Sequence, residues 1–219
     1  AHELNQPLNT IRVITDGFLF GRDEEWALDT DELYESLDLV SRQVVRMTQV
    51  IQNIRDFARE EGNGSYVDVD VNQALENVFS MIGRQIEAHG INVEKHFDQG
   101  LPPIRANIYQ LEQVLMNLLV NARQALDGSH RSSKTIVVRT DHYHGRLQIE
   151  VSDNATGIKT DRLNTVFDPF YTTKEPGVGT GLGLSICQSI ITGLGGRIKV
   201  YNNDSGGATF VIQIPGGGP

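Results

Sequence analysis

The sequence reads FDPFYTTKEPGVGTGLGLSI over residues 167–186. Glycine stands at every second position from Gly177 to Gly183, and residues without a Cβ atom let the backbone approach a ligand closely. The apolar segment that follows is predicted to be a helix to about Thr192, whose N-terminus attracts anions such as phosphates. A flexible linker would not merge directly into an apolar helix. The stretch therefore predicts an α/β domain with a phosphate-binding loop, beside which Lys174 is a mobile cation.

Short strands and helices alternate on both sides of this loop. Period-two alternation predicts strands in YVDVDVN (66–72) and INVEKHF (91–97), and a hairpin over residues 135–153 that turns at His144-Gly145. Helices are expected over Gln73–His89 and over Ile108–Leu126, the second opened by an Asn107 and Gln110 capping box, and a last strand pair over 196–204 and 206–215. These elements predict an α+β sandwich with a mixed, mainly antiparallel sheet.

The N-terminal part has a different pattern. Apolar residues separated by alternating steps of four and three predict one long helix with a narrow apolar seam, which consists of Leu33, Leu37, Val40, Val44, Met47, Ile51, Ile54 and Ala58. An Asp29-x-x-Glu32 capping box opens this helix and the glycine cluster at 62–65 ends it. The first segment has a similar stripe that ends before Gly21. We expect an antiparallel helical hairpin over residues 1–62 and a second domain over 63–219.

Two helices cannot enclose a core of their own, so the seam is expected to pair with a second copy in a dimeric four-helix bundle. The second helix, with about 30 residues, would be roughly 45 Å long, whereas the first, with about 19, would reach only roughly 28 Å. We therefore expect the first helix to extend upstream of Ala1, in a longer protein that carries a sensing region.

Composition excludes several classes of protein. With 39% apolar residues, 21% charged residues and a net charge of −9, the chain is typical of a soluble protein and not of a nucleic-acid-binding surface. No apolar run approaches the roughly 18 residues of a membrane span. The lone Cys187 fits a reducing compartment and is read as a small buried hydrophobe. We expect a cytoplasmic fragment, whose full-length protein could still be anchored to a membrane. Because the chain is acidic, a bound polyphosphate would need a metal.

A candidate nucleophile stands in HELNQPL at residues 2–8. His2 offers an imidazole, Glu3 could orient or deprotonate that ring, and Gln6 shares its helix face at i+4. Pro7 should bend the helix because it has no N–H to donate to the carbonyl of Glu3. A lone exposed histidine is more often an ordinary surface residue.

Two further segments carry polar groups suited to a nucleotide. Asn117 and Asn121 lie four apart on one helix face, where a carboxamide oxygen could bind Mg²⁺, and Arg123 follows two residues later. Asp153 ends an apolar strand and could accept a hydrogen bond from an exocyclic amine such as that of adenine. Taken singly, asparagine pairs are usually solvated and a strand-end aspartate usually forms a turn.

In their order these segments resemble the histidine kinase family, over essentially all 219 residues. HELNQPL is similar to the H box, NLLVNA to the N box, DNATG to the G1 box, FDPFYTTK to the F box and GTGLGL to the G2 box. The resemblance implies a Bergerat-type ATP domain, shared with gyrase and the Hsp90 chaperones. HELNQPL with a long hairpin resembles the dicarboxylate-sensing and hydrogenase-regulating subgroup.

The resemblance also implies roles for single residues. His2 would be the phosphoacceptor, Glu3 its acid-base partner, Asn121 the Mg²⁺ ligand and Asp153 the adenine ligand. Asn117 and Arg123 would lie close by, and the phosphates would be covered by Lys174 and by a lid formed of Gly179, Thr180, Gly181, Leu182 and Gly183. The G1 box keeps Gly157, but Ala155 replaces its usual first glycine. If that position needs a positive φ or close approach to adenine, the methyl group would weaken nucleotide binding.

The resemblance implies an ATP-dependent protein-histidine kinase that phosphorylates His2 and transfers the phosphoryl group to an aspartate of a response regulator. In the reverse direction, Gln6 would orient a water that dephosphorylates the regulator. Two alternatives remain open at this stage. One is a conformational ATPase of the gyrase or Hsp90 type, and the other is a degenerate dimeric scaffold that binds nucleotide without chemistry.

Overall fold

The computed structural model describes residues 2–24, 29–58, 65–143, 145–172 and 181–216, with side chains described except at 2–4, 23, 45–46 and 48–58. The chain folds as two compact units, one containing the hairpin at residues 1–63 and the other formed by residues 64–171 and 181–219. The predicted domain boundary between residues 62 and 63 lies within 59–64, outside the described residues.

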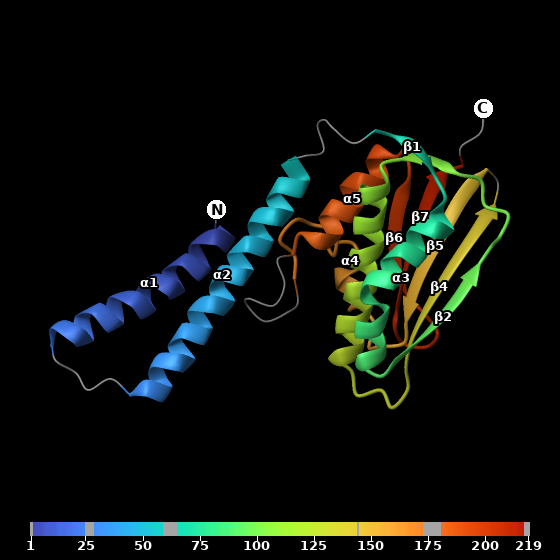
Figure 1. Cartoon of the computed structure of the whole chain (residues 1–219). Helices are drawn as coiled ribbons and strands as arrows, with labels where there is room; N and C mark the ends of the chain where they lie inside the picture. The colour runs from blue at the N-terminus through green and yellow to red at the C-terminus, as the bar shows by residue number, and fades with distance from the viewer. Residues whose placement is uncertain (1, 25–28, 59–64, 144, 173–180, 217–219) are drawn as a thin grey trace. The chain divides into compact units, whose positions relative to one another are not determined.

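The first unit contains the predicted helical hairpin, with α1 at His2–Asp23 and α2 at Thr30–Ala58 (Figure 1). The N-terminus of α2 is capped as predicted at Asp29, whose Oδ1 accepts the N–H of Asp31 at 2.9 Å. α1 continues past Gly21, where its end was predicted. A single glycine costs a helix only about 1 kcal/mol, so it does not by itself end the helix.

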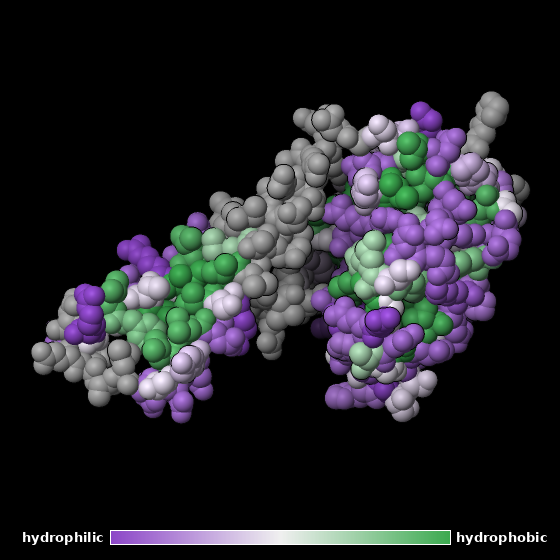
Figure 2. Space-filling model, viewed as in Figure 1, coloured by the Kyte–Doolittle hydropathy of each residue, from purple (hydrophilic) through white to green (hydrophobic). Residues whose placement is uncertain are grey.

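Apolar side chains remain exposed along this hairpin. Figure 2 shows apolar surface on it, and half or more of the side chain is exposed at Leu8, Leu19, Phe20 and Leu37, with Val44 at 49%. Leu37 and Val44 belong to the α2 seam, and the other seam residues whose side chains are described, Leu33, Val40 and Met47, are partly buried. The hairpin therefore covers only part of its own apolar seam.

The second unit is built on a five-stranded sheet with the order β2-β4-β5-β7-β6. β2 (Ile91–Phe97) runs parallel to β4 (Lys134–Tyr143), and the other pairs are antiparallel, formed with β5 (Arg146–Asp153), β7 (Ala208–Pro215) and β6 (Arg197–Asn202). The β4–β5 hairpin pairs Tyr143 with Arg146, which places its turn where the sequence predicted it. The predicted mixed, mainly antiparallel sheet is confirmed.

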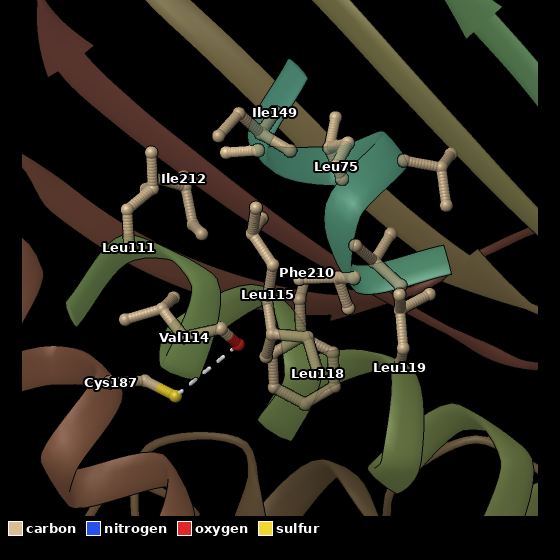
Figure 3. Close-up of a cluster of buried hydrophobic side chains, with 14 of the residues drawn as sticks. Leu75, Leu111, Val114, Leu115, Leu118, Leu119, Ile149, Cys187, Phe210 and Ile212 are labelled. Carbon is tan, nitrogen blue, oxygen red and sulfur yellow. Dashed lines mark hydrogen bonds between the residues drawn. The ribbon is translucent and has the colours of Figure 1, made fainter. Parts of the chain in front are cut away.

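Three helices pack on one face of this sheet: α3 (Val71–Ala88), α4 (Ile108–Asp127) and α5 (Gly183–Gly193) (Figure 1). In the core, Leu115, Leu118 and Leu119 of α4 gather with strand residues such as Ile149 and Phe210 (Figure 3). Cys187 of α5 is fully buried in the same cluster, as predicted, and burial raises the pKa of its thiol to about 12. The helix layer and the sheet of the α+β sandwich therefore share one core, to which α4 contributes centrally.

Three details differ from the sequence predictions. Asp70 caps α3 through the N–H groups of Asn72 and Gln73, so the helix begins at Val71 and shortens the predicted strand to β1 (Val67–Val69). β1 pairs with β3 (Ile104–Ala106), which was not predicted because three residues are too few to show a period. A short 3₁₀ turn, η2 (Thr160–Arg162), was also missed.

None of the helices in the described ranges has the length and hydropathy of a membrane-spanning segment.

Candidate functional site

Asp153, the last residue of β5, is held by the backbone on one side of its carboxylate. Its side chain is 5% exposed, and Oδ1 accepts the N–H of Ala155 at 2.9 Å and the N–H of Ala208 at 3.3 Å. Burial raises the pKa of this carboxyl, and the two backbone hydrogen bonds oppose that shift. Oδ2 has no hydrogen bond to the residues that the structure describes. One oxygen of a fixed carboxylate is thus left to accept a donor from a ligand.

Glycines bring neighbouring backbone close to this carboxylate. A Cβ atom at Gly207 would lie 2.1 Å from the carbonyl oxygen of Asp153, so only glycine permits this approach. Gly157 has a φ of +69°, and a Cβ atom there would lie 2.7 Å from Oδ1 of Asn202. That same Oδ1 accepts the N–H of Ile158 at 2.8 Å. The predicted importance of Gly157 therefore has a steric basis.

Ala155 fits its position without strain. Among the described residues other than glycine, Phe170 alone has a positive φ, so Ala155 lies outside the left-handed region. Its methyl group is fully buried in the domain. The N–H that Ala155 gives to Asp153 is a backbone group, which any residue except proline could supply. The backbone at this position is therefore compatible with a residue other than glycine.

The two asparagines of α4 have different surroundings. Asn117 donates from Nδ2 to the carbonyl of Gly183 at 3.4 Å and to Sγ of Cys187 at 3.7 Å, which ties α4 to the start of α5. Asn121 is half-buried, and its carboxamide has no hydrogen bond to another described residue. The carboxamide of Asn121 is therefore available to a metal ion, whereas the carboxamide of Asn117 already links α4 to α5 through its Nδ2.

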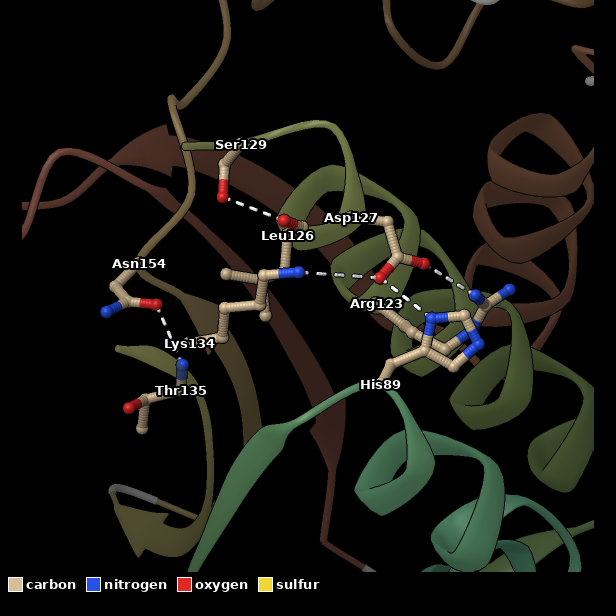
Figure 4. A network of polar contacts seen from close by, with 8 residues as sticks. All are labelled: His89, Arg123, Leu126, Asp127, Ser129, Lys134, Thr135 and Asn154. Carbon is tan, nitrogen blue, oxygen red and sulfur yellow. Dashed lines mark hydrogen bonds and ion pairs between the residues drawn. The ribbon is translucent and has the colours of Figure 1, made fainter. Parts of the chain in front are cut away.

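Arg123 points to a different partner from the one predicted. Its guanidinium donates to Asp127 at 2.7 Å, and Asp127 also contacts Nδ1 of His89 at 2.9 Å and Nζ of Lys134 at 3.8 Å (Figure 4). Six residues along a helix turn the side chain by about 240°, so Arg123 leaves the face that carries Asn117. This geometry does not support the predicted nucleotide contact of Arg123.

The glycine-rich loop is described only where it ends. Lys174, Gly179 and Thr180 lie outside the described residues, whereas Gly181, Leu182 and Gly183 lead into α5. Gly181 has a φ of +65°, and a Cβ atom there would lie 2.4 Å from the carbonyl carbon of Phe170. The end of the loop therefore packs against backbone of the F box segment.

The three residues predicted for phosphate chemistry lie in the first turns of α1. His2 and Glu3 begin the helix, and their side chains are outside the described part of the chain. Gln6 is exposed, and Pro7 lies inside the helix and is buried. Since Pro7 has no N–H, the carbonyl of Glu3 loses its usual helical partner next to His2.

Comparisons with known proteins cover both units. Residues 106–217 match the histidine kinase-, DNA gyrase B- and HSP90-like ATPases, and residues 1–63 match the His Kinase A (phospho-acceptor) domain. The chain belongs to the histidine kinase family. The resemblance found in the sequence motifs is confirmed, and the ATPase match identifies the second unit as the ATP-binding type.

Individual histidine kinases support this assignment. The chain is 34% identical to the two-component sensor PprA of Pseudomonas aeruginosa and 33% identical to the sensor protein FixL of Bradyrhizobium diazoefficiens, each over 98% of this chain. It spans 23% and 42% of those proteins, less than half of either. The catalytic domain of the histidine kinase ThkA superposes with a TM-score of 0.61 at 28% identity, covering 69% of this chain and 97% of that domain.

Three residues of this histidine kinase site were not predicted. Arg131, Asn203 and Gly207 hold the backbone around Asp153, and none belongs to a sequence motif used above. The Gly206-Gly207 pair at the start of a strand could have indicated a close backbone approach. Arg131 and Asn203 gave no such signal, because their partners lie 24 and 50 residues away in the sequence.

Proposed function

We propose that this chain is the catalytic core of a two-component sensor kinase. A ring nitrogen of His2 attacks the γ-phosphorus of ATP, the bond to the ADP oxygen breaks, ADP leaves and the ring gives up its proton to Glu3. The phosphoryl group then passes to an aspartate of a response-regulator receiver domain. The observation that carries this proposal is the carboxylate of Asp153, fixed at one oxygen and open at the other, in a chain that also has a phospho-acceptor hairpin.

Asp153 is proposed to recognise the adenine base. The exocyclic amine of adenine is a donor, and Oδ2 of Asp153 is an acceptor that two hydrogen bonds to Oδ1 hold in place. A hydrogen bond to an ionised carboxylate is stronger than a neutral one. The buried setting of Asp153 adds selectivity, because a base without that donor would leave the carboxylate unpaired.

Asn121 is proposed to bind Mg²⁺ through its carboxamide oxygen, and bound Mg²⁺ neutralises phosphate charge. A neutral oxygen ligand would fit this hard cation. Lys174 and the loop from Gly179 to Gly183 are proposed to cover the phosphates. Asn117 contributes indirectly, because it fixes the start of α5 relative to α4.

The rival functions fit these observations less well. The degenerate scaffold drew its support from Ala155, and the ordinary φ of that residue shows that its backbone does not require glycine. A conformational ATPase would have no use for a phospho-acceptor hairpin, which matches residues 1–63. We propose further that the hairpin makes a homodimer and that this part of the protein acts in the cytoplasm.

The decisive experiment is incubation of the chain with γ-labelled ATP and Mg²⁺. Acid-labile label is expected on the chain and should be lost in a His2→Gln variant that still binds ATP. Asp153→Ala should weaken ATP and ADP binding alike, whereas Asn121→Ala should remove chiefly the Mg²⁺-dependent part. Hydrolysis of ATP without any phosphohistidine would support the conformational ATPase instead.

Glu3 and Gln6 are proposed to act in opposite directions of phosphate flow. In a chain extended upstream of Ala1, Glu3→Gln should slow autophosphorylation by roughly 10²–10⁴-fold, the usual contribution of general acid-base help. Gln6→Ala should leave that rate nearly intact and slow dephosphorylation of the regulator. Loss of phosphohistidine formation in Gln6→Ala, or an unaltered rate in Glu3→Gln, would contradict this division of roles.

A further inference from the structure

Arg131 joins two loops that are distant in the sequence. Its guanidinium donates to the carbonyl of Ala155 from Nε at 3.2 Å and from Nη2 at 3.1 Å. The same Nη2 donates to the carbonyl of Ser205 at 2.9 Å. One side chain from the loop after α4 therefore bridges the G1 segment and the turn between β6 and β7.

Those two segments are the ones that hold Asp153. Ala155 gives its N–H to Oδ1, and Ala208, three residues after Ser205, gives the second N–H. Two hydrogen bonds close the turn: the N–H of Asn203 donates to the carbonyl of Gly207 at 2.9 Å, and the N–H of Gly207 donates to Oδ1 of Asn203 at 3.0 Å. Asn203 also donates to the carbonyl of Asp153 at 2.9 Å. A shift of either segment would therefore move a donor of the carboxylate.

The turn is shaped to admit the guanidinium. Gly206 has a φ of +85°, and a Cβ atom there would lie 2.6 Å from Nη2 of Arg131. Arginine suits this bridge because its planar fork donates in two directions at once, which the ammonium of lysine does with less fixed geometry. The contacts are all to backbone carbonyls, so the bridge fixes loop geometry and not side-chain packing.

We propose that Arg131 is a positioning residue for base recognition, which locks the two backbone donors of Asp153 so that Oδ2 stays aimed at the exocyclic amine of adenine. This inference rests on the proposed function of Asp153. The terminal torsion of an aspartate has broad, shallow minima, so a carboxylate with loosened donors rotates easily. Loss of Arg131 should then reduce discrimination between bases and leave phosphate binding in place.

The test compares ATP with ITP, whose base carries an oxo group in place of the amine, by calorimetry on the full chain with Mg²⁺. The unmodified chain should bind ATP at least about tenfold more tightly than ITP, because only ATP has the exocyclic amine that donates to Oδ2, whereas ITP places an oxo oxygen at that position. In Arg131→Met this ratio should fall below about threefold, chiefly through weaker ATP binding. Arg131→Lys should give an intermediate ratio.

Arg197→Met is the matched control. Nε of Arg197 donates to Oε1 of Gln213 at 2.7 Å on the same sheet, with no bond to the segments around Asp153. This variant should keep the ratio of the unmodified chain. If Arg131→Met kept that ratio as well, the inference would be overturned, even if both nucleotides bound more weakly. If Arg131→Met failed to fold, an unchanged ratio in Arg131→Lys would overturn it equally.

Asp153→Ala separates this inference from the proposed function. Collapse of the ratio in Asp153→Ala together with an unchanged ratio in Arg131→Met would refute the role of Arg131 alone. If Asp153→Ala bound both nucleotides as the unmodified chain does, base recognition by Asp153 would itself be refuted, and the role of Arg131 with it.

Discussion

Asp153 places an acidic group in a buried position, and this burial raises its pKa above the ordinary value of 3.8. A group whose pKa is raised by folding contributes stability below its unfolded pKa, and that contribution is lost as the pH rises through the folded pKa. The ionised carboxylate at neutral pH is therefore unfavourable for the protein without nucleotide. Binding of a donor to Oδ2 compensates that cost, which links the stability of the domain to its ligand.

Asp153→Asn should separate stability from binding. The carboxamide oxygen can still accept the N–H groups of Ala155 and Ala208, while the NH₂ group replaces Oδ2 and faces the adenine amine as a second donor. We expect a higher thermal midpoint at neutral pH, a gain that shrinks as the pH falls and Asp153 becomes protonated, and ATP binding weaker by about tenfold or more. Calorimetric scans with and without ATP measure both effects. Asp204→Asn, at an exposed residue, is the control, and a lower midpoint in Asp153→Asn would contradict the expectation.

Ala155 and Gly157 should respond in opposite ways to exchange. Ala155→Gly removes a buried methyl from a residue with ordinary φ and should cost about 1 kcal/mol of stability while ATP affinity stays nearly constant. Gly157→Ala forces a Cβ atom to within 2.7 Å of Asn202 at a φ of +69°, and should lower both stability and affinity. Chemical denaturation and calorimetry on the two variants test this. Tighter ATP binding in Ala155→Gly would mean that the methyl group does obstruct adenine.

At the scale of residues, the sequence indicates which side chains suit a nucleotide site, but it does not indicate which partners those side chains contact. Asp153 and Asn121 could be proposed as site residues because they lie in segments that resemble the family motifs. For Arg123 the sequence did not indicate the direction of the side chain, which donates to Asp127. Arg131 could not be predicted from the sequence. Its contacts are to the carbonyl groups of Ala155 and Ser205, which come together only because β7 pairs with β5.

At the scale of elements, the helices and the main sheet follow from local patterns. Asn107 caps α4 as its sequence predicts, accepting the N–H of Tyr109 at 3.0 Å, and β2 has the predicted bounds. The parallel pairing of β2 with β4 does not follow from alternation, because it depends on α4 and β3 crossing between the two strands. Short pairs such as β1 with β3 escape prediction for the same reason: their stability comes from their partner.

The entry into α5 offers a test of loop geometry. Gly181→Ala should destabilise the domain by at least about 1–2 kcal/mol, because a φ of +65° is unfavourable for a Cβ atom that would also lie 2.4 Å from backbone of Phe170. Gly183→Ala has room, with its nearest described neighbour Asn117 at 3.8 Å, and should hold or raise stability because alanine favours a helix over glycine. Thermal unfolding of both variants provides the measurement. Equal midpoints would show that the loop end is not fixed as described.

At the scale of the whole molecule, the two units differ in how completely they bury their apolar residues. The ATP-binding unit encloses a continuous core in which residues such as Leu115 and Leu118 are fully buried. In the hairpin, Leu37 and Val44 remain about half exposed although they lie on the predicted seam. A periodic apolar row left open on a two-helix unit is suited to a second copy of the same hairpin.

Val44→Asp should therefore convert the protein from a dimer to a monomer, as measured by sedimentation. The substitution places a charge on the seam, where burial against a second copy would desolvate it, and the fold of the ATP-binding unit should not respond. Arg42→Asp is a stringent control, because it changes the charge by two units from the opposite side of α2, where Arg42 is 63% exposed beside Asp38. Arg42→Asp should remain dimeric and both variants should bind ATP as the unmodified chain does. A dimer that persists in Val44→Asp, or that dissociates equally in Arg42→Asp, would show that the copies associate through a surface other than the seam.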